Sequence, residues 1–346
     1  MPANTFATYV HLSHPCGQEV VEVTEELRNE YDVVVVGGGA AGLNGALMLA
    51  RARRSVLVVD AGEPRNAPAE AVHGLLGHDG RPPRELLALG RDEVRRYGGR
   101  VVEARVEAAT AVAPEDGALG FEVTLDDGRS VRARRLLVTT GLVDELPDVP
   151  GLRERWGHEV LHCPYCHGWE VRDRAIGVVA SGPQSVHQAL LFTQWSGDVM
   201  FFTHRSPAPE GEEAEQLAVR AVRVVEGPLA EVVVEDDALT GVRLEGGGTV
   251  VARDALVVAP RMVARAGFLE GVGLKAVEHP SGGGEHVPSV DGTGRTDVPG
   301  VWVAGNVTDL TAQVGASAAA GAMAAAQINM DLLLEDTRLA LAARPA

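Results

Sequence analysis

The sequence contains only three cysteines in 346 residues, and two of them belong to a single C-x-x-C motif. Three cysteines cannot form the disulfide framework of a small secreted domain, and a C-x-x-C in a cytoplasmic enzyme favours catalysis or metal binding. The sequence also lacks any apolar run close to the ~20 residues that a membrane-spanning helix needs. Its first 30 residues show no basic start followed by an apolar stretch, so no signal peptide is expected. These absences predict a cytoplasmic protein.

Positive charge is scarce as well. Lys and Arg number 31 against 48 Asp and Glu, which gives a net charge of −17. This charge repels nucleic acid and anionic membrane surfaces, so neither is an expected partner. Hydrophobic residues make up 45% of the chain and its 41 glycines mostly end apolar runs, as in globular α/β enzymes. The length exceeds what one hydrophobic core usually supports, so two domains are expected.

A βαβ unit opens the chain after a polar, irregular N-terminal extension over residues 1–29. The apolar run Tyr31–Val36 predicts a strand buried on both faces, residues 41–53 predict a helix, and Ser55–Asp60 predict the next strand. This order is typical of a doubly wound α/β fold. The sequence leaves open the role of the extension and of Cys16 within it.

A glycine motif joins the first strand to the first helix. Gly37, Gly39 and Gly42 fit G-x-G-x-x-G, with Ala40 and Ala41 between them. The first glycine permits a tight turn, the second lets the backbone approach a pyrophosphate, and the third allows close helix–strand contact. The helix N-terminus then offers N–H groups to the phosphates, and Asp60 lies where a ribose-binding acid belongs. A dinucleotide site is predicted here.

The rest of the chain predicts a second dinucleotide-type domain inserted into the first. A helix over 85–97 and strands over 101–112, 121–125 and 130–138 precede a boundary near Pro147, Pro150 and Gly151. A second βαβ pattern covers 175–180, 184–195 and 198–203, and a strand at 255–259 leads back. A flexible turn at 281–284, a strand at 301–305 and a helix at 315–334 follow. The predicted domains are 30–145 with 262–336, the inserted 146–261, and a tail at 337–346.

The C-x-x-C motif reads Cys163-Pro-Tyr-Cys166, with His162 and His167 on either side. Two cysteines at this spacing can close a small disulfide ring and exchange it with outside thiols. A neighbouring histidine can accept a thiol proton near neutral pH. Zinc is the alternative because cysteine and histidine supply suitable ligands. The sequence has only one C-x-x-C, however, so no metal is expected.

In combination these motifs resemble the low-molecular-weight thioredoxin reductases over residues 30–335. The glycine motif at 37–42, Thr139-Thr-Gly141, the central C-x-x-C and the segment 299–306 occur in the order of that family. The resemblance implies two Rossmann-like domains and FAD in the first. It also implies that Cys166 faces the flavin, that Cys163 meets the substrate, and that the protein is a homodimer.

The resemblance carries further residues over to the cofactor. Asn306 stands where the family has an aspartate near the ribityl-phosphate region of the flavin, and Gln313 and Val314 match the isoalloxazine contacts. Arg65 and Asn66 either help to hold FAD or form a solvated turn. His73 and His78 either line the entrance or cap loops, and Tyr165 and Trp169 either wall a substrate pocket or pack in the core. The remaining expected cofactor contacts are Ala61, His73, Thr140, Gly141 and Gly305.

Two departures from the family pattern bear on function. The family has an aspartate directly after the second cysteine as acid/base, and here His167 stands there. The second glycine motif is eroded to Ala180-Ser-Gly182-Pro-Gln-Ser185. Ala180 replaces the turn glycine, where a methyl group is costly if the residue needs a positive φ, and Pro183 removes an N–H group from a phosphate-binding turn. Only Arg205 remains of an expected arginine pair for the NADPH 2′-phosphate.

Cys-Pro-Tyr-Cys-His-Gly with an eroded nucleotide site resembles one branch of the family, the FAD-dependent dithiol oxidases of the gliotoxin, holomycin and romidepsin type. The hypothesis is therefore oxidation of a small-molecule dithiol to an intramolecular disulfide, with O2 as acceptor and H2O2 as product. The alternatives are an NADPH-dependent thioredoxin reductase and a redox-sensing flavoprotein that binds a partner.

Overall fold

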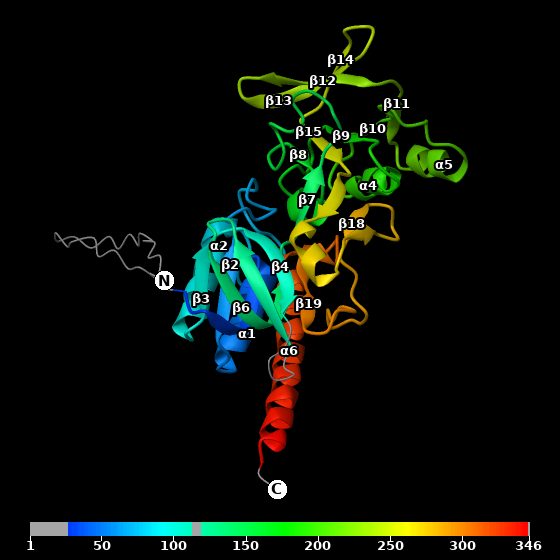
Figure 1. The fold of residues 1–346 in the computed structure, drawn as a ribbon. Coiled ribbons are helices and arrows are strands. Elements are labelled where there is room, and N and C mark those ends of the chain that lie inside the picture. The colour runs from blue at the N-terminus through cyan, green and yellow to red at the C-terminus, as the bar shows by residue number, and fades with distance from the viewer. Residues whose placement is uncertain (1–26, 113–118, 345–346) are drawn as a thin grey trace, which may run out of the picture.

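The computed structural model describes residues 27–112 and 119–344. Cys16 and most of the predicted N-terminal extension lie outside these residues. Figure 1 shows two α/β bodies stacked on one another, with α6 (Val314–Ala342) leaving the first of them as a long helix. The connection between the bodies passes through a small sheet, so the chain leaves the first body and returns to it at one place.

The first body contains a seven-stranded sheet. Its parallel part runs β3 (Arg100–Glu103), β2 (Val56–Asp60), β1 (Glu30–Val36), β6 (Ser130–Val138) and β19 (Val301–Val303), and β5 (Gly120–Leu125) and β4 (Val106–Val112) extend it with antiparallel pairing. The central strands are buried on both faces, which explains their uninterrupted valines. α1 (Ala40–Arg51), α2 (Pro83–Arg96) and the C-terminal helix pack on one face, and residues of β4, β5 and 264–274 pack on the other.

The prediction of one strand over 101–112 was wrong. The structure has β3 parallel to β2 and β4 antiparallel to β5, with Ala104 and Arg105 between them. The Ala104 N–H donates to the Asp60 carbonyl and the Arg105 N–H to the Asp126 carboxylate, so the chain turns there from one partner strand to another. The apolar pattern continues across this corner and conceals it.

The second body repeats the same strand order. β11 (Arg223–Val225), β10 (Val199–Phe202), β9 (Ile176–Val179), β15 (Ala255–Val258) and β8 (Val160–Leu161) form one parallel sheet. It is accompanied by α3 (Pro164–His167), α4 (Ser185–Phe192) and α5 (Gly211–Val219). β9, β10, β11 and β15 correspond to β1, β2, β3 and β6, so the protein has two Rossmann-like domains, the second inserted into the first.

The structure contains two further sheets that were not predicted from the sequence. β12 (Leu229–Glu235), β13 (Ala238–Leu244) and β14 (Val250–Ala252) form an antiparallel sheet on the second domain. β7 (Leu142–Glu145) and β16 (Arg261–Ala264), which connect the domains, pair antiparallel and are extended by β18 (Gly284–His286) and β17 (Val277–Glu278). The short helices η1 (Gly267–Val272) and η2 (Gly305–Val307) follow.

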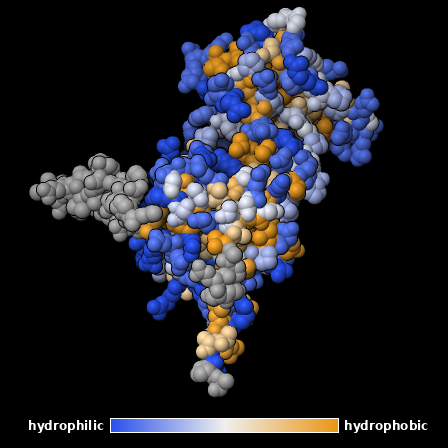
Figure 2. All heavy atoms as spheres, viewed as in Figure 1, coloured by the Kyte–Doolittle hydropathy of each residue, from blue (hydrophilic) through white to orange (hydrophobic). Residues whose placement is uncertain are grey.

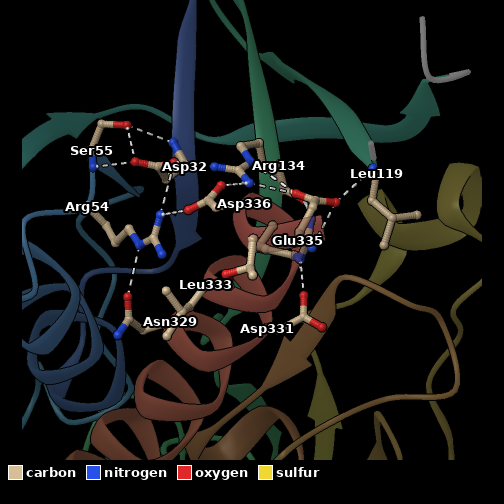
Figure 3. A network of polar contacts seen from close by, with 12 residues as sticks. Asp32, Arg54, Ser55, Leu119, Arg134, Asn329, Asp331, Leu333, Glu335 and Asp336 are labelled. Atoms are coloured by element: carbon tan, nitrogen blue, oxygen red, sulfur yellow. Dashed lines mark hydrogen bonds and ion pairs between the residues drawn. The ribbon is translucent and has the colours of Figure 1, made fainter. Parts of the chain in front are cut away.

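The C-terminal helix α6 (Val314–Ala342) is longer than predicted, and residues 337–342, expected as a tail, are helical. Its first half packs against α1, where the carbonyl of Ala41 lies 1.9 Å from the position of a Cβ on Gly321. Further along, Glu335 and Asp336 bind Arg134, and Asp336 also binds Arg54 (Figure 3). These ion pairs fix the helix beyond the predicted end.

The far end of α6 projects from the body and carries hydrophobic residues, seen in Figure 2 at the bottom of the molecule. Met330, Leu333, Leu334 and Leu341 are each at least half exposed. Within residues 27–112 and 119–344, none of the helices combines the length and apolarity that crossing a membrane requires.

Candidate active site

A cavity of 1540 Å³ extends from the first glycine turn to the cysteine pair. Gly37 adopts a φ of +104°, and a Cβ there would lie 2.5 Å from the carbonyl oxygen of Thr139. A Cβ on Gly42 would lie 1.9 Å from the carbonyl oxygen of Gly37. Both glycines are therefore required by close backbone contacts, as the motif predicts.

Gly39 differs, because a Cβ there would meet no protein atom within 4 Å. The residue lines the cavity at the start of α1, and no side chain caps this helix. The first N–H groups of α1 thus face the cavity without a side-chain partner, which is the arrangement that binds a pyrophosphate. Asp60 lines the same cavity at the end of β2, and its carboxylate lies 3.3 Å from Arg91.

The structure brings most of the predicted cofactor residues together. Gly42 and His73 are absent from the cavity wall: Gly42 packs against the turn, and His73 lies between Asp79 and Glu170, at 3.4 Å and 3.5 Å. The predicted residues that line the cavity are Gly37, Gly39, Ala40, Ala41, Asp60, Ala61, Arg65, Asn66, Thr140, Gly141, Gly305, Asn306, Gln313 and Val314.

Asn306 has a structural role that explains the departure from the family aspartate. Its amide nitrogen donates to the carbonyl oxygens of Asp309 and Ala312, both at 2.9 Å, and reaches that of Leu310 at 3.3 Å. A carboxylate has no hydrogen to donate to these carbonyls. The asparagine therefore holds the loop that carries Gln313 to the cavity.

Arg65 is neither a solvated turn residue nor a free cation. Its guanidinium forms a bidentate pair with Asp144 on β7, at 2.8 Å and 2.7 Å, and the Asp144 side chain is only 6% exposed. This pair attaches the loop after β2 to one of the two strands that connect the domains. Arg65 also acts electrostatically on Cys166, whose thiolate it favours.

The two sulfurs of the C-x-x-C motif lie 2.8 Å apart as free thiols. Cys163 precedes α3 in extended conformation, and Pro164 starts that short helix, so both cysteines face the same cavity. Gln313, from the other domain, points its amide nitrogen at Cys163 Sγ from 3.9 Å. The cysteine pair thus lies at the junction of the two domains.

The environment separates the acidities of the two thiols. The hydrogen bond from Cys166, with those from the backbone N–H groups of Cys166 and Tyr165, lowers the pKa of Cys163 to about 6 despite burial. The same sulfur–sulfur hydrogen bond, together with burial, raises the pKa of Cys166. The reduced pair therefore holds its negative charge on Cys163 and its proton on Cys166.

We expect this thiolate to set the pH profile of alkylation. For the reduced protein, reaction of Cys163 with iodoacetamide should reach half its maximal rate near pH 6, because only the thiolate reacts and its fraction rises with pH through the pKa. Peptide mass spectrometry resolves Cys163 from the other cysteines. A midpoint above pH 8, as for free cysteine, would contradict the assigned acidity.

Both histidines beside the pair are partly buried. Burial lowers the pKa of His167, while Glu170 and Glu70 oppose this shift, so the imidazole is neutral at pH 7 and can accept a proton. Burial also lowers the pKa of His162, whose Nδ1 lies 3.2 Å from the Val258 carbonyl oxygen. Gln188, which sequence reasoning missed, donates to the His162 carbonyl at 3.0 Å and lines the cavity.

The aromatic residues beside the cysteines do not pack in the core. Tyr165 is 63% exposed and Trp169 is 65% exposed, and Tyr165 lines the cavity. His78 does not line it. A zinc ion would need further ligands beside the pair, and the described residues contain no group of three or more cysteine, histidine or acidic side chains placed to hold a metal.

The second dinucleotide turn, between β9 and α4, is filled by a side chain. Ser185 occupies the position of Gly42 in the first turn and is 2% exposed. Its hydroxyl accepts from the N–H groups of Ser181 and Gly182, at 3.1 Å and 3.2 Å, and donates to the Gly182 carbonyl at 2.9 Å. Two N–H groups that a phosphate would need are therefore already satisfied within the protein.

The reason expected for the effect of Ala180 was wrong. This residue is not among those with positive φ, in contrast to Gly37, so its methyl group causes no backbone strain. The Ala180 N–H donates to the Phe202 carbonyl just as the Gly37 N–H donates to that of Val59. Arg205, for its part, pairs with Glu245 at 2.9 Å on the surface.

Comparisons with known proteins agree with this architecture. A model of the pyridine nucleotide-disulphide oxidoreductase family matches residues 31–326. Thioredoxin reductase tcpT of Claviceps purpurea is 31% identical, over 88% of this chain and 96% of its own. The crystal structure of HlmI superposes with a TM-score of 0.84 at 46% identity, over 90% of this chain and 95% of its own. An oxidoreductase from Agrobacterium tumefaciens superposes with a TM-score of 0.81 at 37% identity, over 88% and 99% of the respective chains.

The chain thus belongs to the pyridine nucleotide-disulphide oxidoreductase family, and within it resembles the thioredoxin reductases. This is a family of flavoproteins. The uncapped N-terminus of α1, the open space at Gly39 and the acid at Asp60 fit the dinucleotide part of a flavin cofactor.

Two glycine substitutions distinguish cofactor binding from folding. Gly39→Ala should leave the melting temperature of the cofactor-free protein unchanged, because the added methyl group meets no protein atom. It should weaken flavin binding at least about tenfold, because the methyl group would occupy the space in which the backbone approaches the phosphates. Gly42→Ala should lower that melting temperature, because its Cβ would lie 1.9 Å from a carbonyl oxygen. Flavin absorbance per protein and thermal denaturation check the pair, and normal flavin content in Gly39→Ala would contradict the assignment.

Proposed function

We propose that this protein is an FAD-dependent dithiol oxidase, which converts a small-molecule dithiol to an intramolecular disulfide with O2 as acceptor and H2O2 as product. The observation that carries the proposal is a redox-active cysteine pair beside a cofactor cavity, combined with a second nucleotide turn closed by Ser185. Electrons then enter the site from a dithiol rather than from a nicotinamide.

In the proposed reaction, one substrate thiolate attacks the oxidised pair at Cys163, and Cys166 leaves and is protonated. The second substrate thiol then attacks the substrate sulfur of this mixed disulfide, which forms the cyclic disulfide and expels Cys163 as a thiolate. The hydrogen bonds that lower the pKa of Cys163 favour this departure. Because the second attack is intramolecular, effective molarities of ~10⁵ M or more make closure fast.

His167 follows Cys166 directly and is proposed to take the proton of the attacking substrate thiol and pass it to the departing Cys166. The reduced pair now carries the two electrons lost by the substrate and one of its protons, on Cys166, while the proton of the second substrate thiol passes to His167. Bound FAD would supply the two-electron transfer from the cysteines to O2. Cys163 and Cys166 return to the disulfide, and Gln313 stays beside Cys163 at the domain junction.

The first glycine turn is proposed to hold the FAD pyrophosphate through Gly37, Gly39 and the N-terminus of α1, and Asp60 to hold the adenosine ribose. The proposed domain boundaries are those of the sequence, 30–145 with 262–336 for FAD binding and 146–261 for the inserted domain. We also propose that the protein is a cytoplasmic homodimer, and the exposed hydrophobic residues at the end of α6 support the dimer.

Oxygen uptake tests the proposed function. With air-saturated buffer and dihydrolipoamide as dithiol, we expect one O2 consumed and one H2O2 formed per disulfide produced, without added nucleotide. The proposal would be contradicted if the enzyme consumed no O2 with dihydrolipoamide or any other small dithiol but reduced a thioredoxin with NADPH. The protein would then be a thioredoxin reductase, as its relative tcpT is named.

A further inference from the structure

Exposed apolar side chains lie next to the cysteine pair in the sequence and on the loop beside Gln313. Leu76 is 99% exposed, and Tyr165 and Trp169 are about two-thirds exposed. The loop that carries Leu76 lies over the start of α6. Leu75 Cδ1 is 3.6 Å from the position of a Cβ on Gly315, two residues after Gln313. Because Gly74 and Tyr165 line the cavity, exposed large apolar residues on these two segments indicate a binding surface.

Carboxylates accompany these apolar residues. His73, in the loop that precedes Leu76, lies 3.4 Å from Asp79 and 3.5 Å from Glu170, so these contacts bring the loop next to the segment after Trp169. Glu170 and Glu70 also act electrostatically on His167, beside Cys166. We call Leu76, Tyr165 and Trp169 with Glu70, Asp79 and Glu170 the entrance rim.

The two arginines near this entrance already have partners within the protein. The Arg172 guanidinium stacks on Trp169 at 4.2 Å from the ring centroid and donates to the Trp169 carbonyl at 2.7 Å. Arg65, deeper in the cavity, is neutralised by its bidentate pair with Asp144. The rim itself contains three carboxylates, with the Arg172 guanidinium stacked on its Trp169, and the chain as a whole carries a charge of −17.

We infer that the entrance rim selects dithiols that are uncharged or cationic with an apolar body, and that it discriminates against anionic dithiols. This inference rests on the proposed function and specifies its substrate class. The free energy of an anionic substrate rises as it approaches the rim carboxylates, because like charges repel. The apolar residues favour binding of a neutral substrate. Because the carboxylates are exposed, salt should reduce the discrimination.

Dihydrolipoamide and dihydrolipoate provide the test, since they share one dithiol and differ by an amide against a carboxylate. At low ionic strength we expect kcat/KM to be at least about fivefold higher for the amide, and the ratio to fall at 0.5 M salt. The variant Glu70→Gln/Glu170→Gln should bring the ratio to about two or less. Glu213→Gln, an exposed carboxylate on α5, is the matched control and should leave the ratio unchanged.

A second measurement is independent of turnover. Iodoacetamide and iodoacetate differ by the same charge, and their rates at Cys163 of the reduced holoenzyme can be compared with their rates toward free cysteine. We expect the iodoacetate rate to be suppressed at least about threefold more, and the suppression to disappear in Glu70→Gln/Glu170→Gln. If dihydrolipoamide were not oxidised, the proposed function would fail while this test still decided on the rim. Equal relative rates for the two reagents would overturn the inference.

Discussion

Cys163→Ser should abolish the reduction of the flavin by a dithiol, with a loss of at least about 10³-fold in rate. The serine hydroxyl cannot form the mixed disulfide, and it removes the thiolate that the hydrogen bonds at the start of α3 stabilise. Cys166→Ser should have the same effect on catalytic turnover, because neither sulfur alone can close a disulfide. Anaerobic stopped-flow absorbance at 450 nm measures the rate.

Cys16→Ser is the matched control, since this cysteine lies outside the C-x-x-C motif, and its flavin reduction rate should equal that of the unaltered protein. All three variants should retain a yellow flavin, because the glycine turn and Asp60 lie apart from the sulfurs on the first domain. Substantial dithiol-dependent bleaching in Cys163→Ser would show that substrate reaches the flavin directly.

Glu335→Ala should lower the free energy of unfolding by about 3 kcal/mol. The Glu335 side chain is 5% exposed and binds Arg134 at 2.7 Å and the buried Arg135 at 3.1 Å. Removing the carboxylate leaves the guanidinium of Arg135, which is 2% exposed, with Asp331 as its only acidic partner among the described residues. Thermal denaturation followed by circular dichroism measures the loss.

Asp336→Ala is the comparison, because its side chain is 40% exposed, and it should cost about 1 kcal/mol or less. The pH dependence provides a further check. Burial raises the pKa of Glu335, but the hydrogen bonds from Arg134 and Arg135 together lower it by more, so the net shift of the pKa is downward. Its stabilising contribution is therefore complete above the usual carboxyl value of 4.5 and is lost as the pH falls through the lowered pKa. Equal effects of the two substitutions would contradict the network in Figure 3.

The repetitive parts of the fold could be predicted from the sequence. Val33–Val36 and the glycines after them define a buried strand and a tight turn by their own chemistry, and the same pattern recurs less clearly at Ile176–Val179. The antiparallel sheet β12–β14 could not be predicted, because its strands are half exposed and their polar and apolar residues do not alternate regularly. The corner at Ala104 interrupts no pattern, so nothing in the sequence marks it.

At the site, too, the sequence predicts which residues are involved but not how they interact. The positions of Cys163 and Cys166 follow from spacing, but their unequal acidities depend on the hydrogen bond between the sulfurs and on backbone N–H groups, which only coordinates reveal. The pairing of Arg65 with Asp144 joins residues 79 positions apart. Ser185 stands at the last position of the second glycine motif, but the sequence did not predict that its hydroxyl would bind the N–H groups of the turn.

The most direct test of the proposed function is the choice of electron donor. The oxidised enzyme, mixed anaerobically in a stopped-flow spectrometer with NADPH, NADH or dihydrolipoamide, should be bleached near 450 nm rapidly by the dithiol and not by either nucleotide, because Ser185 occupies the second phosphate turn. Admission of air should restore the absorbance and release H2O2. Rapid bleaching by NADPH would contradict this account and place the protein with the reductases.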